Sequence, residues 1–233
     1  MDQNLLKQIN TDRAARLATI LITDLKTGTQ RVVRESELDS GDPLHQDLLA
    51  AFRGGKSRSL ETESGELFLN VYTPPTRLIM TGAVHISQAL YPMARACGHD
   101  VVIVDPREAF GTNERFPDID LITGWPGDHF PNLGIDAYAA IVTLTHDPKI
   151  DDPALEFALN SKAFYIGALG SRKTHARRVE RLTVAGFSEE QISRIAAPVG
   201  LDIGAKSPSE IAVSILAQLT AALRLRTSGE QAG

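Results

Sequence analysis

A glycine-rich turn followed by basic residues is the clearest chemical signal in this chain. A short apolar run at 163–166 enters the turn, and a helix-like segment carrying Arg177, Arg178 and Arg181 leaves it. Backbone amides at a helix start, together with the positive end of the helix dipole, bind phosphate groups. We therefore expect a phosphate site made of the glycines, hydroxyl and charges of this turn, namely Gly167, Gly170, Ser171, Arg172 and Lys173.

An ordinary strand–turn–helix with a solvated basic face is the alternative interpretation of these residues, because charge runs usually face water. The spacing G-x-x-x-x-G-K-S/T is absent, so the turn is not a Walker A loop. The phosphate interpretation is favoured because a second glycine turn lies upstream in the sequence.

The second turn, Gly82-Ala83-Val84-His85, follows an apolar run at 78–81 and opens another helix-like segment. Asp105 ends the next apolar run about twenty residues later, as in dinucleotide-binding folds. Only the first glycine of G-x-G-x-x-G is present, since Val84 and Ser87 occupy the other two positions. The order of elements predicts a Rossmann-like fold, while these departures disfavour a nicotinamide cofactor bound in the usual way.

Further polar residues follow other expected strands. Arg107 either meets a phosphate or pairs with a neighbouring carboxylate, and His85 either contacts a ligand or makes local hydrogen bonds. Asp202, between Gly200 and Gly204, either bonds a ligand or stabilises its loop. His146-Asp147 either forms an acid/base or metal pair or makes a simple turn before Pro148. Because ligands of parallel sheets bind at the carboxyl ends of the strands, we expect one phosphate-bearing, planar ligand to be shared by these segments. Outside the basic turn, the expected site residues are Gly82, Ala83, Val84, His85, Asp105, Arg107, Thr145, His146, Asp147 and Asp202.

Apolar strands alternate with amphipathic helices from residue 76 to residue 233. A helix is expected from Asp152-Pro153 to about Asn160, and capping boxes at Ser188 and Ser207 should start two more helices. This alternation implies a buried parallel sheet. The predicted fold class is α/β, a Rossmann-like doubly wound and mostly parallel sheet, with strands near 78–81, 101–104, 121–123, 139–144 and 163–166.

Residues 1–75 differ in pattern and predict a small N-terminal α+β unit that ends at Pro74-Pro75. A helix should begin at Asp42-Pro43 and stop at Gly54-Gly55. No catalytic constellation occurs in this unit, which we expect to serve as a cap or a dimerisation element. Its expected strands cover 17–23, 30–34 and 66–72.

Composition excludes several function classes. With 42% hydrophobic and 23% charged residues the chain is typical of a globular protein, and its net charge of −5 argues against nucleic-acid binding. No apolar stretch reaches the ~18 residues needed to span a bilayer. Met1-Asp2-Gln3-Asn4 lacks the features of a signal peptide, so a cytoplasmic location is expected. Cys97, the one cysteine, is expected to be a buried small hydrophobe, and neither a metal-ligand set nor a catalytic nucleophile is evident.

These segments together resemble the XdhC/CoxI family, the accessory factors of xanthine dehydrogenase and related molybdenum hydroxylases. The likeness covers Arg77 to about Arg224, and several motifs in one order are more specific than any motif alone. Before Pro74 the chain lacks a Gly-Ser-x-Pro-Arg stretch and a cysteine-bearing glycine motif, so it resembles a shortened form. Besides the two glycine turns, the resemblance rests on Val104-Asp105-Pro106-Arg107, Glu114-Arg115-Phe116-Pro117, Thr143-Leu144-Thr145-His146-Asp147 and Pro198-Val199-Gly200-Leu201-Asp202-Ile203-Gly204-Ala205.

The resemblance implies a protein that binds the molybdenum cofactor (molybdopterin), assists its maturation and helps to insert it into a molybdenum hydroxylase apoenzyme. A cysteine desulfurase is a second implied partner, a nucleotide is a second candidate ligand, and a homodimer is expected. In this interpretation the turn at 170–173 holds the phosphate and the turn at 82–85 lines the opposite wall. Asp105 and Asp147 would bond amino groups of the pterin.

Two other functions stay open. An NAD(P)-dependent oxidoreductase would need an intact second glycine in place of Val84. A non-binding adaptor would dock onto the hydroxylase through the N-terminal unit, and charge reversal at Arg172 and Lys173 would leave it functional. The cofactor-carrying chaperone ranks first because phosphate-site residues occur without a catalytic nucleophile.

Overall fold

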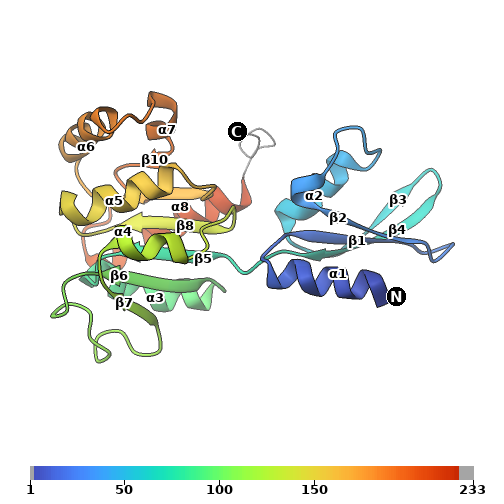
Figure 1. The fold of residues 1–233 in the computed structure, drawn as a ribbon, viewed down its shortest axis with the longest axis horizontal. Helices are drawn as coiled ribbons and strands as arrows, with labels where there is room; N and C mark the ends of the chain where they lie inside the picture. Colours follow the sequence, from blue (N-terminus) through green and yellow to red (C-terminus); the bar gives the residue numbers. More distant parts are fainter. Residues whose placement is uncertain (1–2, 226–233) are drawn as a thin grey trace. The chain divides into compact units, whose positions relative to one another are not determined.

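Residues 3–225 are described by a computed structural model, in which the chain divides into two compact units at Pro74 and Pro75 (Figure 1). The N-terminal unit contains α1 (Gln3–Ala14), β1 (Thr19–Asp24), β2 (Gln30–Arg34), the 3-10 turn η1 (Glu35–Glu37), α2 (His45–Gly54), β3 (Arg58–Thr62) and β4 (Gly65–Tyr72). The C-terminal unit contains β5 (Arg77–Thr81), α3 (His85–Ala96), β6 (Asp100–Asp105), β7 (Asp120–Thr123), α4 (Pro126–His129), η2 (Phe130–Asn132), β8 (Ala139–Thr143), α5 (Pro148–Leu159), β9 (Tyr165–Ala168), α6 (Arg172–Val184), α7 (Glu189–Ser193), β10 (Ile195–Ala196) and α8 (Pro208–Arg224).

The N-terminal unit is a four-stranded antiparallel sheet in the order β2-β1-β4-β3, with α1 and α2 packed against it. Ile20 in the apolar run of β1 and Leu69 of β4 are fully covered. Phe52 of α2 is also buried. Asp12 of α1, nearly inaccessible to solvent, is paired with Arg34 at 2.9 Å, so the charge that this helix brings inside is neutralised.

The C-terminal unit is a six-stranded parallel sheet in the order β10-β9-β8-β5-β6-β7. β5 is the first strand, and the chain adds β6 and β7 on one side of it before β8, β9 and β10 on the other. This is the doubly wound order of the Rossmann fold, whose topological switch point lies between β5 and β8. The α/β fold class expected from the sequence is confirmed.

Two apolar layers hold this sheet. Leu78 and Met80 of β5 face α3 and α8, where they pack with Leu90 and Ile215. Ile79, which points to the other face, packs against the side of α4, α5 and α6 (Figure 1). Because both faces are covered, the strands are apolar at nearly every position, as expected for parallel strands.

Several local expectations need correction. The helix expected at Asp152 begins further upstream, because Asp147 is its N-cap, accepting the amide of Lys149 at 2.9 Å, and Pro148 occupies its first position. The helix expected at Asp42 begins at His45 instead. Its expected cap is otherwise engaged, since the Asp42 carboxylate pairs with Arg31.

Cys97 was expected to be buried, but it is exposed. It is the C-cap of α3, beyond the last buried position, Ala94, and Gly98 then turns the chain with φ +85°. The helix α1 and the strand β3 were not expected from the sequence. Only Ile9 and Asp12 of α1 are buried, and β3 is a largely exposed edge strand, so neither carries a strong apolar pattern.

Candidate functional site

The carboxyl edge of the parallel sheet brings together the turns expected to form the site. Gly82 follows β5, and Thr145 follows the adjacent strand β8. A Cβ atom on Gly82 would lie 2.8 Å from Cγ2 of Thr145, so the two segments touch at the switch point. The Gly170 turn follows β9, one strand farther along the same edge. In doubly wound sheets this edge is where ligands bind.

The turn at Gly82 uses its amides internally. Gly82 N–H donates to the carbonyl of Val104 at 3.0 Å, and Ala83 N–H donates to the buried carboxylate of Asp105 at 2.7 Å. Val84 N–H donates to the hydroxyl of Ser87 at 2.9 Å. A pyrophosphate over this helix start would need these same donors. Because these donors are already engaged within the chain, the turn is poorly suited to a dinucleotide.

Asp105 is saturated by its own chain. Besides Ala83 N–H, it accepts from the amide, Nε and Nη2 of Arg107, at 3.0, 2.9 and 2.7 Å. These donors fill the lone-pair sites that a carboxylate offers. Burial alone would raise the pKa of Asp105, but the hydrogen bonds from Arg107 and Ala83 outweigh it and hold the pKa below its ordinary value. Asp105 thus fixes the Gly82 turn to the loop after β6.

Arg107 has a second contact, since its guanidinium also stacks over the ring of Phe110, 4.3 Å from the centroid. Arg115 ties the same loop to the Gly82 turn by donating to the carbonyls of Ala83 at 3.1 Å and Phe110 at 2.7 Å. The side chain of His85, at the start of α3, is exposed. The wall formed by the Gly82 turn and the loop after β6 is therefore held in place by side chains of the chain itself.

Asp151, which the sequence did not single out, organises the loop after β8. Its buried carboxylate accepts from the hydroxyls of Thr81 at 3.1 Å and Thr145 at 2.7 Å, and from the amide of His146 at 3.0 Å. Burial raises the pKa of Asp151 in spite of these hydrogen bonds. His146 adopts φ +64°, which is uncommon outside glycine. The exposed side chains of His146 and Asp147 are presented from a loop fixed at its base.

The Gly170 turn differs from the Gly82 turn in its amides. The hydroxyl of Ser171 caps α6 by accepting the amide of Thr174 at 3.2 Å. Within the described residues, the amides of positions 170–173 make no hydrogen bond, because the first amides of a helix have no acceptor within the helix. Arg172 and Lys173 are exposed at this start. The combination of open amides and positive charge suits a phosphate group.

Gly167 is not brought to this surface. It lies inside β9, and a Cβ there would meet Cγ2 of Val199 at 2.6 Å, so its small size permits close packing of the segment after β10. That segment also reaches the carboxyl edge and carries the exposed Asp202. Gln218 of α8 anchors it, because its Oε1 accepts the amide of Gly200 at 2.8 Å and the hydroxyl of Tyr165 at 2.5 Å.

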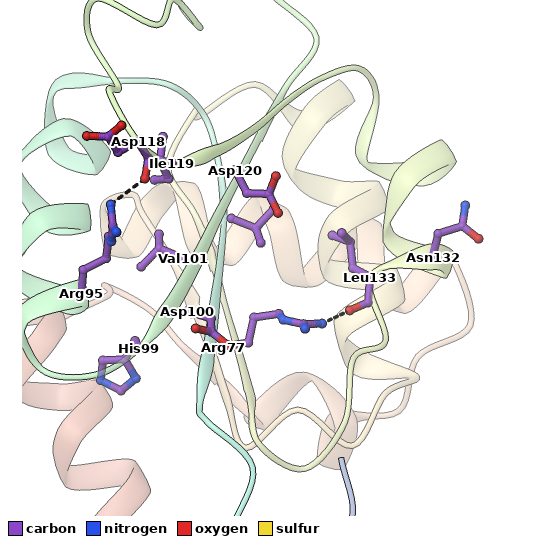
Figure 2. A pocket seen from close by; sticks show the side chains of 11 residues that line it. Arg77, Arg95, His99, Asp100, Val101, Asp118, Ile119, Asp120, Asn132 and Leu133 are labelled. Carbon is purple, nitrogen blue, oxygen red and sulfur yellow. Dashed lines mark hydrogen bonds between the residues drawn. The ribbon is translucent and has the colours of Figure 1, made fainter. Parts of the chain in front are cut away.

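A cavity of about 460 Å³ lies at the opposite, amino edge of the sheet, where β5, β6 and β7 begin. Figure 2 shows its two arginines bonded to main-chain carbonyls, Arg77 to Leu133 and Arg95 to Asp118, the latter at 2.5 Å. Asp100, Asp118 and Asp120 also line it. Its three carboxylates outnumber its two arginines, so its net charge does not favour an anionic ligand.

Residues 3–225 contain no group of three or more His, Cys, Asp or Glu side chains that could hold a metal ion. None of the helices described is both long and apolar enough to cross a membrane.

Residues 78–219 match the XdhC Rossmann domain. The chain belongs to the XdhC family. The matched region spans the parallel sheet and the turns at Gly82, Thr145 and Gly170, and it leaves out the N-terminal antiparallel sheet. The resemblance inferred from the motifs is confirmed.

Curated relatives and a solved structure show the same likeness to the XdhC family. The chain is 34% identical over 158 residues to a Bacillus subtilis protein named as a probable subunit of xanthine dehydrogenase, covering 67% of this chain and 46% of that protein. It is 32% identical over 154 residues to "Molybdenum cofactor insertion chaperone PaoD" of Escherichia coli, covering 66% and 42%. The chain therefore spans less than half the length of these two relatives. A crystal structure described as a xanthine dehydrogenase from Bacillus halodurans superposes with a TM-score of 0.67 at 27% identity, covering 97% of this chain and 65% of that one.

Proposed function

We propose that this protein is an accessory factor that carries the molybdenum cofactor, supports its maturation and delivers it to a molybdenum hydroxylase of the xanthine dehydrogenase class. The observation that carries the proposal is the placement of three turns, at Gly82, Thr145 and Gly170, on one edge of the sheet. Membership of the XdhC family supports it, as do relatives named for molybdenum cofactor insertion and for xanthine dehydrogenase.

The site fits a ligand with a planar ring and a phosphate. Adjacent strands lie ~4.8 Å apart, so the turns after β5 and β9 are separated by about 10 Å across β8. A pterin ring would lie near the switch point, where His85 and His146 are exposed, and the phosphate would lie over the start of α6. Asp147 Oδ2 has no partner within the described residues and can accept from a pterin amino group. The cargo supplies redox chemistry in the recipient enzyme, and in this chain the residues only bind and orient it.

Exposed apolar side chains on the same edge support transfer to a protein partner. Phe110, Trp125, Leu201 and Ile203 are between 42% and 55% exposed, on loops that follow β6, β7 and β10. Exposed aromatic and aliphatic side chains of this size favour a protein contact when they lie around a binding site. The proposed partners are the hydroxylase apoenzyme and a cysteine desulfurase, the proposed assembly is a homodimer, and a nucleotide is a proposed second ligand.

A nicotinamide-dependent oxidoreductase is a weaker explanation of the site, because the amides of Gly82, Ala83 and Val84 are already bonded within the chain. A melting experiment with NADH and NADPH, compared with AMP and adenosine 2′,5′-bisphosphate as controls that lack the nicotinamide, separates the two functions: the carrier predicts no shift beyond that of the controls, and a dehydrogenase predicts further stabilisation by the cofactor.

Recovery of pterin from the purified protein tests the proposal. The protein is prepared from a molybdenum-replete host, denatured, and assayed for released, oxidised pterin by its fluorescence. We expect pterin in the wild type and at least a several-fold loss in a double variant with Arg172→Glu and Lys173→Glu, because charge at the start of α6 is reversed. Absence of pterin even after reconstitution with molybdopterin would contradict the carrier and favour a non-binding adaptor.

A further inference from the structure

Buried polar side-chain atoms without a hydrogen-bond partner gather around the loop after β9. In the part of the chain that the structure describes they are Oγ1 of Thr143, Nδ1 of His175, and Nε and Nη1 of Arg178. Thr143 ends β8, whereas the other two residues lie one turn apart on α6. Leu169 joins these elements, since its amide donates to the carbonyl of Thr143 at 2.8 Å and its carbonyl accepts from Nη2 of Arg178 at 2.9 Å.

Arg178 is only 2% exposed, although it stands in a run of basic residues. Side chains on a helix point back toward its start, so the guanidinium returns beneath the turn that precedes α6. A Cβ on Gly170 would lie 3.8 Å from Nη2 of Arg178. The positive charge is therefore buried directly under the turn whose amides at 170–173 make no hydrogen bond.

No carboxylate in residues 3–225 forms an ion pair with Arg178. Asp151 attracts it through space, but the oxygens of Asp151 already accept from Thr81, Thr145 and His146. Burial lowers the pKa of Arg178 from its ordinary value, yet an arginine remains charged at neutral pH. A buried charged group with two donor nitrogens left without hydrogen-bond partners destabilises a fold unless a ligand supplies them.

Arg194, a more exposed arginine of the same unit, is bonded to several main-chain carbonyls. Its Nη1 donates to the carbonyl of Leu159 at 2.9 Å, and its Nη2 donates to those of Ser161 and Ala163, each at 3.1 Å. Arg178 has one such carbonyl, at Leu169. This contrast indicates that Nε and Nη1 of Arg178 donate to a bound ligand.

We propose that Arg178, the hydroxyl of Thr143 and the amides of residues 170–173 form a pocket for a phosphomonoester dianion. This proposal rests on the proposed function in taking that phosphate to be part of the carried cofactor. A phosphate has three terminal oxygens that accept several hydrogen bonds each, and guanidinium and helix-start amides are its usual donors. Because Nε and Nη1 of Arg178 are covered here, the Gly170 turn must lift to admit the phosphate.

Two threonines at the ends of neighbouring strands provide a matched test. Thr81 and Thr143 are register partners, and the hydroxyl of Thr81 donates to Asp151 whereas that of Thr143 has no partner. In phosphate-free buffer, Thr143→Val should melt at or a few degrees above the wild type, and Thr81→Val should melt lower. Inorganic phosphate, compared with chloride at equal ionic strength, should raise the melting temperature of the wild type and of Thr81→Val. The rise in Thr143→Val should be at most half as large.

Arginine variants extend the test. Arg178→Met should lose the phosphate-induced rise in melting temperature. In phosphate-free buffer it should melt above Arg194→Met, because the latter leaves three main-chain carbonyls without their donor. If Arg178→Met does not fold, Thr143→Val decides alone. The proposed pocket would be ruled out if phosphate did not raise the melting temperature of the wild type. It would also be ruled out if the full rise persisted in Thr143→Val or Arg178→Met.

Competition identifies the source of the phosphate and separates this proposal from the carrier function. If released molybdopterin displaces bound phosphate more readily than a nucleoside monophosphate does, the result supports the pocket and assigns it to the pterin. The reverse order supports the pocket and assigns it to a nucleotide. Phosphate binding through Arg178 without any pterin binding would support the pocket and contradict the carrier. Pterin binding that is equal in wild type, Thr143→Val and Arg178→Met would overturn the pocket and leave the carrier standing.

Discussion

The Cγ2 atom of Thr145 lies 2.8 Å from the position that a Cβ of Gly82 would take. This contact joins the ends of β5 and β8, where the order of strands reverses. Gly82 also has φ +102°, a conformation that side chains rarely adopt. The close approach of the two turns at the switch point therefore depends on the absence of a single methyl group.

Gly82→Ala should lower the free energy of unfolding by about 1–3 kcal/mol, because it adds both a steric clash and backbone strain. Thr145→Ser in the same chain should recover part of this loss, since it removes Cγ2 but keeps the hydroxyl that donates to Asp151. Urea unfolding of the four proteins of this cycle measures the coupling. Simple additivity of the two changes would show that the contact is not a constraint.

Asp151→Asn should weaken the loop after β8. The amide cannot accept from all the donors that face the carboxylate, so we expect a loss of about 1–3 kcal/mol in unfolding free energy and faster hydrogen exchange at 144–148. Asp147→Asn is the matched control, because asparagine caps a helix about as well as aspartate. Equal effects of the two changes would argue against a special role for Asp151.

Acid should weaken the tie between Asp105 and Arg107. Burial raises the pKa of Asp105, but the hydrogen bonds from Arg107 and Ala83 lower it by more, so the pKa lies below its ordinary value. A carboxyl with a lowered pKa stabilises the fold above its ordinary value of 3.8, and this stabilisation disappears as the pH falls through the folded-state pKa. Asp105→Asn should thus be less stable than the wild type at pH 7, by about 1–3 kcal/mol, with the gap narrowing below about pH 4. A gap that is constant from pH 7 to about pH 3 would exclude this linkage.

Gln218→Leu should free the segment that carries Asp202. The substitution keeps the approximate size of the side chain, but it removes the acceptor shared by Gly200 N–H and the hydroxyl of Tyr165. We expect faster hydrogen exchange at residues 199–205, with little change in α3 or β6. Unchanged exchange in that segment would mean that other contacts hold it.

The fold was predictable because its signals are local. Apolar runs marked β5, β6, β8 and β9, and the capping boxes at Ser188 and Ser207 marked the starts of α7 and α8. The helix start at Asp147 was missed because an aspartate–proline pair occurs twice within a few residues, and burial of Ile150 and Asp151 decides for the first pair.

The site was predictable only as a set of turns. Which amides remain open depends on side-chain geometry, and the saturation of Asp105 by Arg107 and Ala83 cannot be read from spacing. Arg178 resembles its exposed neighbour Arg177 in the sequence. One signal was available: Arg178 and the buried Leu182 are four positions apart, so they lie on the same inward face of α6.

Binding of the cofactor at the carboxyl edge of the sheet is tested by hydrogen exchange with and without bound molybdopterin, because the protected peptides show where on the protein the cargo lies. We expect slower exchange at the carboxyl edge, in peptides covering 82–86, 144–148 and 169–175, and no change around Arg77 and His99 at the amino edge. Protection confined to the amino edge, or no protection by a ligand shown to be bound, would contradict binding at the carboxyl edge.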